Sequence, residues 1–475
     1  MHVHFLGVCG TFMAGLALIA RELGHRVTGS DRNIYPPMSE VLARAGIDPI
    51  AGYDPAQLEP APDVVVVGNS MTRGNPCVEH ILETGLSHTS GPAWLSAHVL
   101  AGRHVVAVAG THGKTTTTAM IAVIAEAAGL DPGFLVGGVP RDFDVVARVG
   151  RGGPRQLFVI EADEYDTAFF DKRSKFLHYR PRTLVLNNLE FDHADIFRDL
   201  PDMQRQFHHV VRIVPAGGRI VAGAGQRPID EVLAMGCWSP VERVGAGGDW
   251  SALMATPDGS RFQVRHHGRA VAEIEWEQRG AHNVANALAA IAAARHAGIE
   301  PTLAARALGR FKGVRRRLEH HATVAGVAIY DDFAHHPTAI EAAIGALRAT
   351  RGSEAGAGRL LAVLELASNT MRRGTHRATL GPALAGADAA WVLAPAQTSE
   401  AGGWDPQVLA REDGTVRVRH DIDTIVRECG AAARPGDAIL MMSNASFGGI
   451  RDRLVAVLRA RAPRPLHRGV TAPGG

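Results

Sequence analysis

The sequence predicts an α/β protein with three domains: a Rossmann-like N-terminal domain, a central P-loop ATPase domain with a parallel sheet, and a C-terminal Rossmann-like α/β domain. Three observations predict this architecture. Short apolar, strand-like runs alternate with amphipathic, helix-like segments along most of the chain, which is typical of parallel sheets. At 475 residues the chain is too long for one ordinary hydrophobic core. Residues 104–120 read as a strand, a glycine turn and a helix, which is the arrangement that cradles phosphates.

The composition excludes several classes of protein. Hydrophobic residues make up 46% of the chain and charged residues 21%, as in soluble globular proteins, and the net charge of +2 gives no reason to expect a nucleic acid or a membrane surface as partner. Four scattered cysteines without a C-x-x-C pair argue against disulfides and a zinc site. Neither a signal peptide nor an apolar run of membrane-spanning length is present, so we expect a cytoplasmic enzyme. The sequence does not indicate an oligomeric state.

The phosphate-cradling stretch begins with a buried strand, His104 to Ala109, which breaks at a glycine turn. A helix follows from Lys114. We expect backbone N–H groups of the turn and the positive helix N-terminus to face an anion, Lys114 to reach the β- and γ-phosphates, and the Thr115 hydroxyl to face Mg²⁺. The usual pattern has a glycine where this chain has Val108. The alternative is a plain glycine turn before a threonine-rich helix, but the strand and helix around the turn favour a nucleoside triphosphate site.

The first segment, residues 1–102, contains a second glycine turn, Gly7 to Thr11, between a strand and an amphipathic helix. Asp31 follows about 20 residues later, where a ribose-binding acid stands in dinucleotide folds. The G-x-G-x-x-G pattern is nevertheless absent, because Cys9 and Phe12 occupy two of the glycine positions. A nicotinamide oxidoreductase is therefore disfavoured. We favour a nucleotide-diphosphate ligand over a plain structural turn.

In the central segment, residues 103–321, polar side chains follow the predicted strands. The acidic run 161–166 follows one strand, and Glu161, nearest to that strand, is the best candidate for a metal ligand. His193 follows the next strand and could ligate a second divalent ion. His282 and Asn283 lie at the start of an alanine-rich helix, and we expect one of them to cap it. Arg317 belongs to an arginine run that could clamp a phosphate, or could be a basic surface turn.

The third segment, residues 322–461, repeats this arrangement. Its predicted strands include Thr323 to Tyr330, Arg359 to Leu364 and Ala438 to Met442, and polar stretches follow each of them. The carboxyl ends of parallel strands meet at one edge of a sheet, so we expect these polar residues to face one site. The Pro/Gly/Arg-rich tail, residues 462–475, is predicted to be disordered.

Six motifs in this order, AGTHGKTTTTAM, EADEYD, NNLEFDH, GAHNVANA, RRRL and YDDFAHHPT, resemble the Mur ligase family, the ATP-dependent amide-forming enzymes of peptidoglycan synthesis. GTHGKTTTTAM and DDFAHHPT are similar to the branch that adds L-alanine to UDP-N-acetylmuramate. FLGVCGTFMAGLA, GSDRNIYPPMS, SNTMRRGTH and MMSNASFGGI more closely resemble the murein-recycling branch. The resemblance implies ATP and Mg²⁺ as cofactors and two small-molecule substrates, UDP-N-acetylmuramate and the murein tripeptide L-alanyl-γ-D-glutamyl-meso-diaminopimelate. It also implies that an acyl phosphate forms on the way to the amide bond.

The resemblance also implies roles for matching positions. The UDP-sugar would be held by Gly7, Gly10, Thr11, Ser30, Asp31 and Ser70. ATP would be bound by Gly110, Thr111, His112, Gly113, Lys114, Thr115, Thr116, Asn283, Arg317 and Asp331. The metal ligands would be Thr115, Glu161 and His193, and Lys114 would be a catalytic group. The places of His193 and His335 among the motifs, and not the resemblance itself, make these two histidines the candidates for accepting a proton from the attacking amine. The peptide would be read by Arg372, Arg373, Ser443 and Asn444.

Several alternatives stay open at this point. The main alternative is the UDP-N-acetylmuramate–L-alanine ligase of peptidoglycan biosynthesis. Folylpolyglutamate-type ligases are a distant one, since they do not need a UDP loop in the first domain. An ATP-driven binding module is the alternative from another class, and the turn from Gly7 to Thr11 argues against it.

Overall fold

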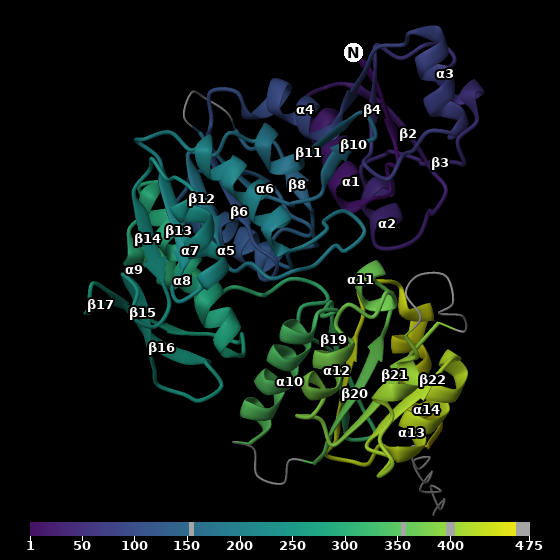
Figure 1. Ribbon diagram of the computed structural model, residues 1–475, viewed down its shortest axis with the longest axis vertical. Coiled ribbons are helices and arrows are strands. Elements are labelled where there is room, and N and C mark those ends of the chain that lie inside the picture. Colours follow the sequence, from purple (N-terminus) through teal and green to yellow (C-terminus); the bar gives the residue numbers. More distant parts are fainter. Residues whose placement is uncertain (152–155, 353–357, 396–403, 462–475) are drawn as a thin grey trace, which may run out of the picture. The chain divides into compact units, whose positions relative to one another are not determined.

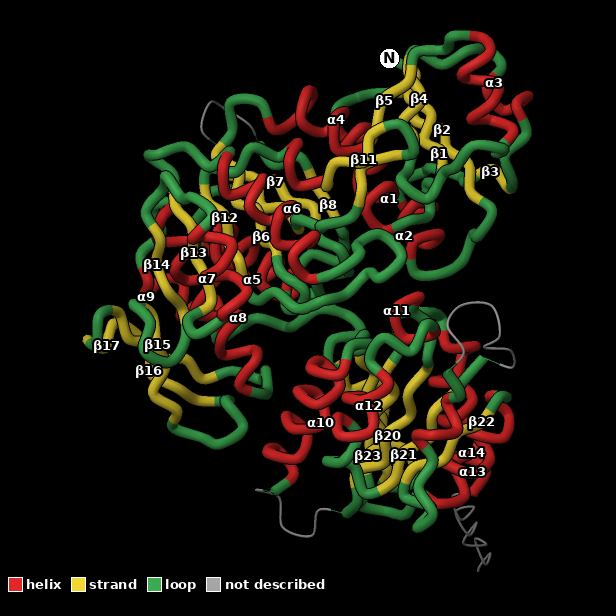
Figure 2. Tube along the Cα trace, viewed as in Figure 1, coloured by secondary structure: helices red, strands yellow, loops and turns green. Residues whose placement is uncertain are grey.

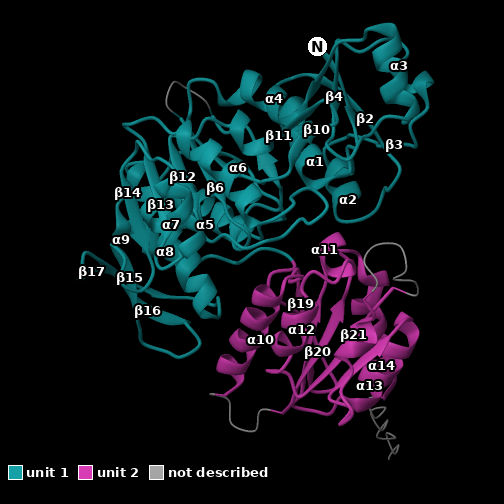
Figure 3. Ribbon diagram, in the orientation of Figure 1, with its two compact units in different colours: residues 1–315 teal, residues 316–475 magenta. Residues whose placement is uncertain are grey.

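The computed structural model describes residues 1–151, 156–352, 358–395 and 404–461, so the tail expected to be disordered, 462–475, lies outside the described residues. The chain divides into two compact units, Met1–Arg315 and Arg316–Gly475 (Figure 3). Unit 1 contains two large sheets and unit 2 contains one. The division falls a few residues before the boundary expected at 321.

The first sheet of unit 1 is parallel throughout, in the order β3-β2-β1-β4-β5. Its strands are β1 His2–Leu6, β2 Arg26–Asp31, β3 Ile50–Ala51, β4 Val64–Val67 and β5 His88–Ser90, and its helices are α1 Thr11–Glu22, α2 Met38–Arg44, α3 Pro76–Thr84 and α4 Gly91–Leu95. Leu6 pairs with Ser30 and with Val67, so the ends of three neighbouring strands lie at one edge. The glycine turn after β1 begins at this edge.

The second sheet of unit 1, whose strands are yellow in Figure 2, has the order β17-β16-β15-β14-β13-β12-β6-β9-β7-β8 and is parallel from β15 to β7. Its strands are β6 His104–Ala109, β7 Gly133–Leu135, β8 Ala147–Arg148, β9 Leu157–Glu161, β12 Thr183–Leu186, β13 Arg219–Gly223, β14 Val241–Val244, β15 Trp250–Met254, β16 Arg261–His266 and β17 Arg269–Glu275. The predicted parallel sheet is confirmed, with antiparallel strands added at both ends.

Helices cover both faces of this sheet because the strands are apolar on both faces. Alternate residues of β6 enter two different core clusters, Val106 and Val108 in one, Val105 and Ala107 in the other. The first cluster includes α5 Lys114–Ala127, α8 Ala281–His296 and α9 Pro301–Leu308, and the second includes α6 Leu200–Arg212 and α7 Arg227–Ala234 (Figure 1). A separate hairpin, β10 Asp166–Ala168 and β11 Asp171–Ser174, follows β9.

Unit 2 is a six-stranded sheet of order β18-β19-β23-β20-β21-β22 with helices on both faces. Its elements are β18 Glu319–Val324, β19 Val327–Asp332, α10 Pro337–Arg351, β20 Leu360–Glu365, α11 Asn369–Arg372, α12 Arg377–Ala383, β21 Ala389–Leu393, β22 Val416–Arg419, α13 Ile422–Ala432, β23 Ala438–Met442 and α14 Ile450–Arg461. The single strand expected at Thr323–Tyr330 is wrong. Ala325 (φ 51°) and Gly326 (φ 76°) turn the chain there, so β18 and β19 form an antiparallel hairpin.

A helix that crosses a bilayer needs about 20 consecutive, mostly apolar residues. In the part of the chain that the structure describes, every helix is too short or too polar for this.

Candidate active site

The glycine turn between β6 and α5 forms as expected, and the loop after the neighbouring strand β12 is hydrogen-bonded to it. Gly113 has φ +78°, and a Cβ there would overlap the Asn286 Oδ1 atom, so only glycine fits. The loop after β12 supplies two hydrogen bonds to the turn. The Asn188 carbonyl accepts from the Thr111 N–H (3.2 Å), and Asn188 Oδ1 accepts from the His112 N–H (2.7 Å). The backbone that would surround a phosphate is therefore held in place by residues far away in the sequence.

Lys114 is joined to His193 through Glu164. The Lys114 ammonium donates to the Gly110 carbonyl (2.7 Å) and to Glu164 Oε2 (3.0 Å), while His193 Nε2 lies 3.1 Å from Glu164 Oε1. The Glu164 side chain is fully buried. His193 itself has φ 53°, an unusual conformation for a non-glycine residue, and its N–H donates to Asp192 Oδ1 (2.7 Å).

The charges of this cluster reinforce one another. Burial alone would raise the pKa of Glu164, but the Lys114 ammonium and the His193 hydrogen bond outweigh it and lower that pKa to about 2. Burial alone would lower the pKa of Lys114, and the carboxylates of Glu164, Asp163 and Glu161 outweigh it, so the pKa is raised. At neutral pH the pair is therefore a carboxylate and an ammonium, and the Lys114 ammonium carries the positive charge that binds phosphate oxygens.

Thr115 and Glu161 form the second polar pair of the site. The Thr115 hydroxyl donates to Glu161 Oε1 (2.9 Å), and the Gly137 N–H donates to Glu161 Oε2 (2.6 Å). Both side chains are more than 90% buried. Val108 on β6 pairs with Glu161 on β9, so the parallel register brings the end of β9 beside the phosphate turn. A hydroxyl and a carboxylate at hydrogen-bond distance are oxygen ligands of the kind that Mg²⁺ prefers.

The start of α8 contributes amide side chains to the floor of the turn. Asn286 Oδ1 accepts from the Thr117 hydroxyl (3.2 Å), and its Nδ2 donates to Asn283 Oδ1 (3.3 Å). Asn283 in turn donates to the Arg279 carbonyl (2.8 Å). The helix begins at Ala281 after Gly280, so His282 and Asn283 lie inside its first turn, and the prediction that one of them is the N-cap is wrong. Thr116 lies in the first turn of α5 and is buried.

The first glycine turn lies at the edge of the N-terminal sheet. The N–H groups of Gly7 and Val8 donate to the Ser30 carbonyl (2.8 and 3.1 Å), and Gly10 is the N-cap of α1, which begins at Thr11. Asp31 accepts from the N–H groups of Cys9 and Asn33 (2.9 Å each). The Asp31 carboxylate therefore shapes the turn. Ser70 adjoins the same turn, with its Oγ 3.7 Å from the position of a Cβ at Gly7.

Unit 2 places its candidate residues at the carboxyl ends of β19 and β23. Asp331 is buried and pairs with Arg451 (3.2 Å) and Arg316 (3.4 Å), and burial raises its pKa against the effect of these arginines. The Arg317 guanidinium lies 4.9 Å from the centre of the Phe333 ring. Arg316, which belongs to the arginine run considered as a phosphate clamp, also donates to the carbonyls of Ser443 (2.7 Å) and Ala445 (2.8 Å). Arg316 therefore links the end of β19 to the loop after β23.

The remaining candidates of unit 2 lie in loops beside that edge. The Ser443 hydroxyl donates to Glu365 Oε2 (2.5 Å) and accepts from the Ala445 N–H (2.9 Å), which links the ends of β23 and β20. Asn444 adjoins it, with its Oδ1 buried. Arg372 and Arg373 are exposed at the end of α11. His335 follows β19, and its Nδ1 lies 2.9 Å from the Phe333 carbonyl.

Sequence reasoning missed Glu164, the residue that joins Lys114 to His193. It stands in the acidic run after β9, in which Glu161 was the only named candidate. The run of acids marked the right segment, but spacing within an irregular loop does not tell which carboxylate turns inward. Asn188 and Asn286 were also missed: both lie within quoted motifs, NNLEFDH and GAHNVANA, but their contacts with the turn join segments that are distant in the sequence.

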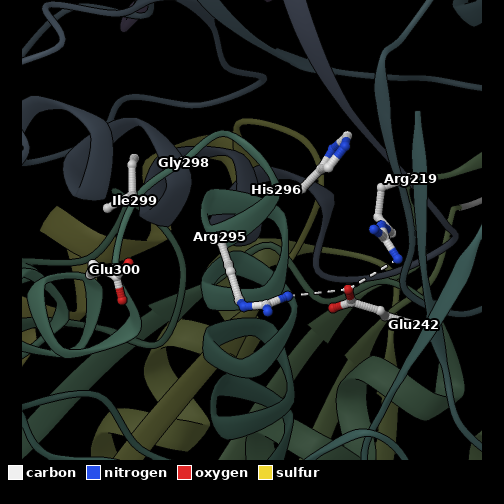
Figure 4. A pocket seen from close by; sticks show the side chains of 7 residues that line it. All are labelled: Arg219, Glu242, Arg295, His296, Gly298, Ile299 and Glu300. Atoms are coloured by element: carbon white, nitrogen blue, oxygen red, sulfur yellow. Dashed lines mark ion pairs between the residues drawn. The ribbon is translucent and has the colours of Figure 1, made fainter. Parts of the chain in front are cut away.

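A cavity of about 330 Å³ lies away from the phosphate turn, at the amino-terminal ends of the parallel strands (Figure 4). Arg219 and Arg295 both pair with Glu242 there (3.3 and 3.5 Å). With Glu300 also in its lining, the two arginines and two glutamates cancel in charge. The cavity offers no net attraction for an anionic substrate.

Three family models match the chain: the Mur ligase family catalytic domain over residues 2–103, the Mur ligase middle domain over 108–294, and the Mur ligase glutamate ligase domain over 316–445. The UDP-N-acetylmuramate–L-alanyl-gamma-D-glutamyl-meso-2,6-diaminoheptandioate ligase of Escherichia coli (strain K12) is 53% identical over 465 residues, 97% of this chain and 99% of the relative. A UDP-N-acetylmuramate–L-alanine ligase of Renibacterium salmoninarum is 34% identical over 471 residues, 97% of this chain and 96% of the relative.

Among solved structures, a crystal structure of a murein peptide ligase from Psychrobacter arcticus 273-4 matches with a TM-score of 0.76 and 45% identity. The match covers 97% of this chain and 99% of that one. The family models together span most of the chain, and the relatives match it nearly from end to end. This chain, with its phosphate turn, buried Lys114–Glu164 pair and three matched domains, therefore belongs to the Mur ligase family and is a ligase.

Proposed function

We propose that this enzyme joins UDP-N-acetylmuramate to the tripeptide L-alanyl-γ-D-glutamyl-meso-diaminopimelate, with hydrolysis of ATP to ADP and phosphate, in murein recycling. The observation that carries the proposal is the 53% identity over nearly the full length to the E. coli ligase named for that reaction, against 34% to an alanine-adding ligase. ATP and a UDP-sugar are both nucleotides of the cytoplasm, so we place the reaction there.

The geometry of unit 1 supports a phosphoryl transfer at the β6–α5 turn. The backbone of residues 110–113, with Thr116 behind it, would surround the phosphates of ATP, and Lys114 would turn from Glu164 toward the β- and γ-phosphates. Mg²⁺ would be held by Thr115, Glu161 and His193 and would neutralise charge on the transferring group. The Glu161 carboxylate and Thr115 hydroxyl, 2.9 Å apart and buried, suit a hard cation.

Two chemical steps follow from this arrangement. The muramate carboxylate attacks the γ-phosphorus, which yields an acyl phosphate and ADP. The amine of the L-alanyl residue then attacks the acyl carbon, phosphate leaves, and a proton passes from the amine to a base, for which His193 or His335 is the candidate. Activation is needed because a carboxylate is a poor electrophile.

The other site residues are assigned by the same proposal. The turn containing Gly7, Gly10 and Thr11, together with Ser30, Asp31 and Ser70, would bind the UDP-sugar. Asn283, Arg317 and Asp331 would bind ATP. Arg372, Arg373, Ser443 and Asn444 would read the peptide.

The test is phosphate release from Mg-ATP in the presence of UDP-N-acetylmuramate, with either the tripeptide or L-alanine as acceptor, and the mass of each product. We expect UDP-muramyl-tripeptide from the tripeptide and little reaction with free alanine. A strong preference for alanine would transfer the enzyme to the biosynthetic branch. Failure with both acceptors would refute the proposal.

A further inference from the structure

Lys175 is a buried lysine with no role in the mechanism above. It begins a short 3-10 helix, Lys175–His178, directly after the β10–β11 hairpin, and only 6% of its surface is exposed. Its Nζ lies 5.1 Å from the centre of the Phe12 ring and 5.4 Å from that of the Tyr165 ring. The backbone N–H of Lys175 donates to the Tyr165 carbonyl (2.9 Å), which fixes the start of the side chain.

The ammonium group of Lys175 lacks the partner that a buried charge normally has. Among the residues that the structure describes, no carboxylate lies within 4.0 Å of it and no acceptor is hydrogen-bonded to it, whereas Lys114 and Lys172 lie 3.0 and 2.6 Å from their carboxylates. Burial lowers the pKa of Lys175, although more distant carboxylates, those of Asp163 and Asp166 first, oppose the shift. Two cation–π contacts do not replace the hydration that a buried ammonium loses.

The position of this ammonium connects the two proposed substrate sites of unit 1. Phe12 directly follows the glycine turn of the first domain, in the first turn of α1. Tyr165 adjoins Glu164, and its ring centre lies 4.2 Å from that of His193. Lys175 therefore lies between the turn assigned to the UDP-sugar and the cluster assigned to phosphoryl transfer.

We propose that the Lys175 ammonium binds an anionic group of the nucleotide-sugar substrate, either its diphosphate or its lactyl carboxylate. This inference rests on the proposed function. A positive group that is buried beside two aromatic rings and has no carboxylate or hydrogen-bond acceptor next to it among the described residues favours an incoming anion, which would complete its hydrogen bonds. A lysine that served only to pack Phe12 against Tyr165 would need no charge.

The first experiment compares Lys175→Met and Lys175→Arg with the wild type. Met keeps the length and the apolar contacts, and Arg keeps the charge. We expect the dissociation constant for UDP-N-acetylmuramate, measured by calorimetry, to rise about 10-fold to 100-fold in the Met variant and less in the Arg variant. Affinity for a non-hydrolysable ATP analogue should not change. The melting temperature without ligand should stay the same or rise, because an unpaired buried charge is removed.

Lys172→Met is the matched control. Lys172 lies on the same hairpin, but its side chain is 69% exposed and pairs with Asp166, so the same change of charge should leave substrate affinity unaltered. A purely structural role for Lys175 would instead lower the melting temperature and weaken both ligands together. That outcome, or an unchanged affinity for the UDP-sugar, would overturn the inference.

UDP-N-acetylglucosamine, which lacks the lactyl carboxylate, separates the two anions. Equal losses of affinity for both UDP-sugars assign Lys175 to the diphosphate, and a loss confined to UDP-N-acetylmuramate assigns it to the carboxylate. Product formation by the wild type is measured separately. A wild type that forms no product refutes the proposed function, whereas an unchanged UDP-sugar affinity in Lys175→Met refutes only the role of Lys175.

A measurement on the wild type keeps the inference testable if the Met variant does not fold. The chain has only four lysines, Lys114, Lys172, Lys175 and Lys312, so lysine labelled with ¹³C at Cε gives few NMR signals. The Lys175 signal is assigned from the Arg variant. Addition of UDP-N-acetylmuramate should raise the Lys175 pKa and shift this signal, and an unmoved signal at saturation would refute the contact.

Discussion

Replacing Thr115 by valine removes one hydroxyl and keeps the shape of the side chain. In the structure Thr115 is 3% exposed and donates to Glu161 Oε1 at 2.9 Å, and Glu161 is 8% exposed. The variant would place a methyl group against a buried carboxylate. It therefore tests both the stability of the site and the proposed binding of Mg²⁺ by Thr115.

The expected magnitude follows from the charge of the acceptor. A hydrogen bond to a charged group contributes about 1.5–3 kcal/mol, and the loss is at the upper end when the acceptor stays buried. Glu161 keeps its bond from the Gly137 N–H (2.6 Å), which limits the loss to about 2 kcal/mol of unfolding free energy. If Thr115 also ligates the metal, kcat/KM should fall about 100-fold or more, equivalent to about 2.7 kcal/mol of transition-state stabilisation.

Thr118→Val is the control, because the Thr118 hydroxyl is buried in the same helix but donates to the Lys114 carbonyl (2.8 Å). Loss of the Thr118 hydroxyl leaves no carboxylate without a hydrogen-bond donor, so we expect the free energy of unfolding to change by less than about 1 kcal/mol. Urea denaturation followed by circular dichroism measures stability, and phosphate release over a range of Mg²⁺ concentrations measures activity. If Thr115→Val matched Thr118→Val in both assays, the reasoning would be refuted. A loss of stability with full activity would refute the metal assignment alone.

Three further predictions follow from other buried groups. Glu164→Gln should lower the unfolding free energy by about 3 kcal/mol in urea denaturation, since it leaves the buried Lys114 ammonium without its carboxylate at 3.0 Å; an unchanged midpoint would show that the pair contributes little. Asp31→Asn should weaken UDP-N-acetylmuramate binding about 10-fold and spare ATP binding in calorimetry, because the Asp31 carboxylate accepts from the Cys9 N–H of the glycine turn and from the Asn33 N–H after β2; an equal effect on both ligands would contradict this. Burial lowers the pKa of His4 to about 4 from 6.5. Between these pH values the unfolded chain therefore binds more protons than the folded one. The free energy of unfolding should fall by about 1.4 kcal/mol per pH unit as the pH falls from 6.5 to 4. His4→Gln should show a shallower pH dependence of its denaturation midpoint, and an identical slope would argue against a neutral His4.

Much of the fold could be predicted because local pattern carries it. The strand predicted at His104 to Ala109 and the helix from Lys114 lie where expected, since a short β-branched run and a glycine turn specify both. The failure at Thr323 to Tyr330 has an equally local cause. Ala325 adopts a positive φ that is unusual for alanine, and Gly326 is the only turn-favouring residue beside it, so the apolar residues on both sides predicted one strand where the chain forms a hairpin.

The candidate site was only partly predictable. The sequence by itself determined the two glycine turns, the acidic run after β9 and the family, because motif spacing and strand ends are properties of neighbouring residues. Only the tertiary structure decided that Glu164 joins Lys114 to His193, and that Lys175 is buried between Phe12 and Tyr165. Whether a charged side chain is buried or paired depends on atoms from distant segments, and no local pattern encodes which of them the fold brings within 3 to 5 Å.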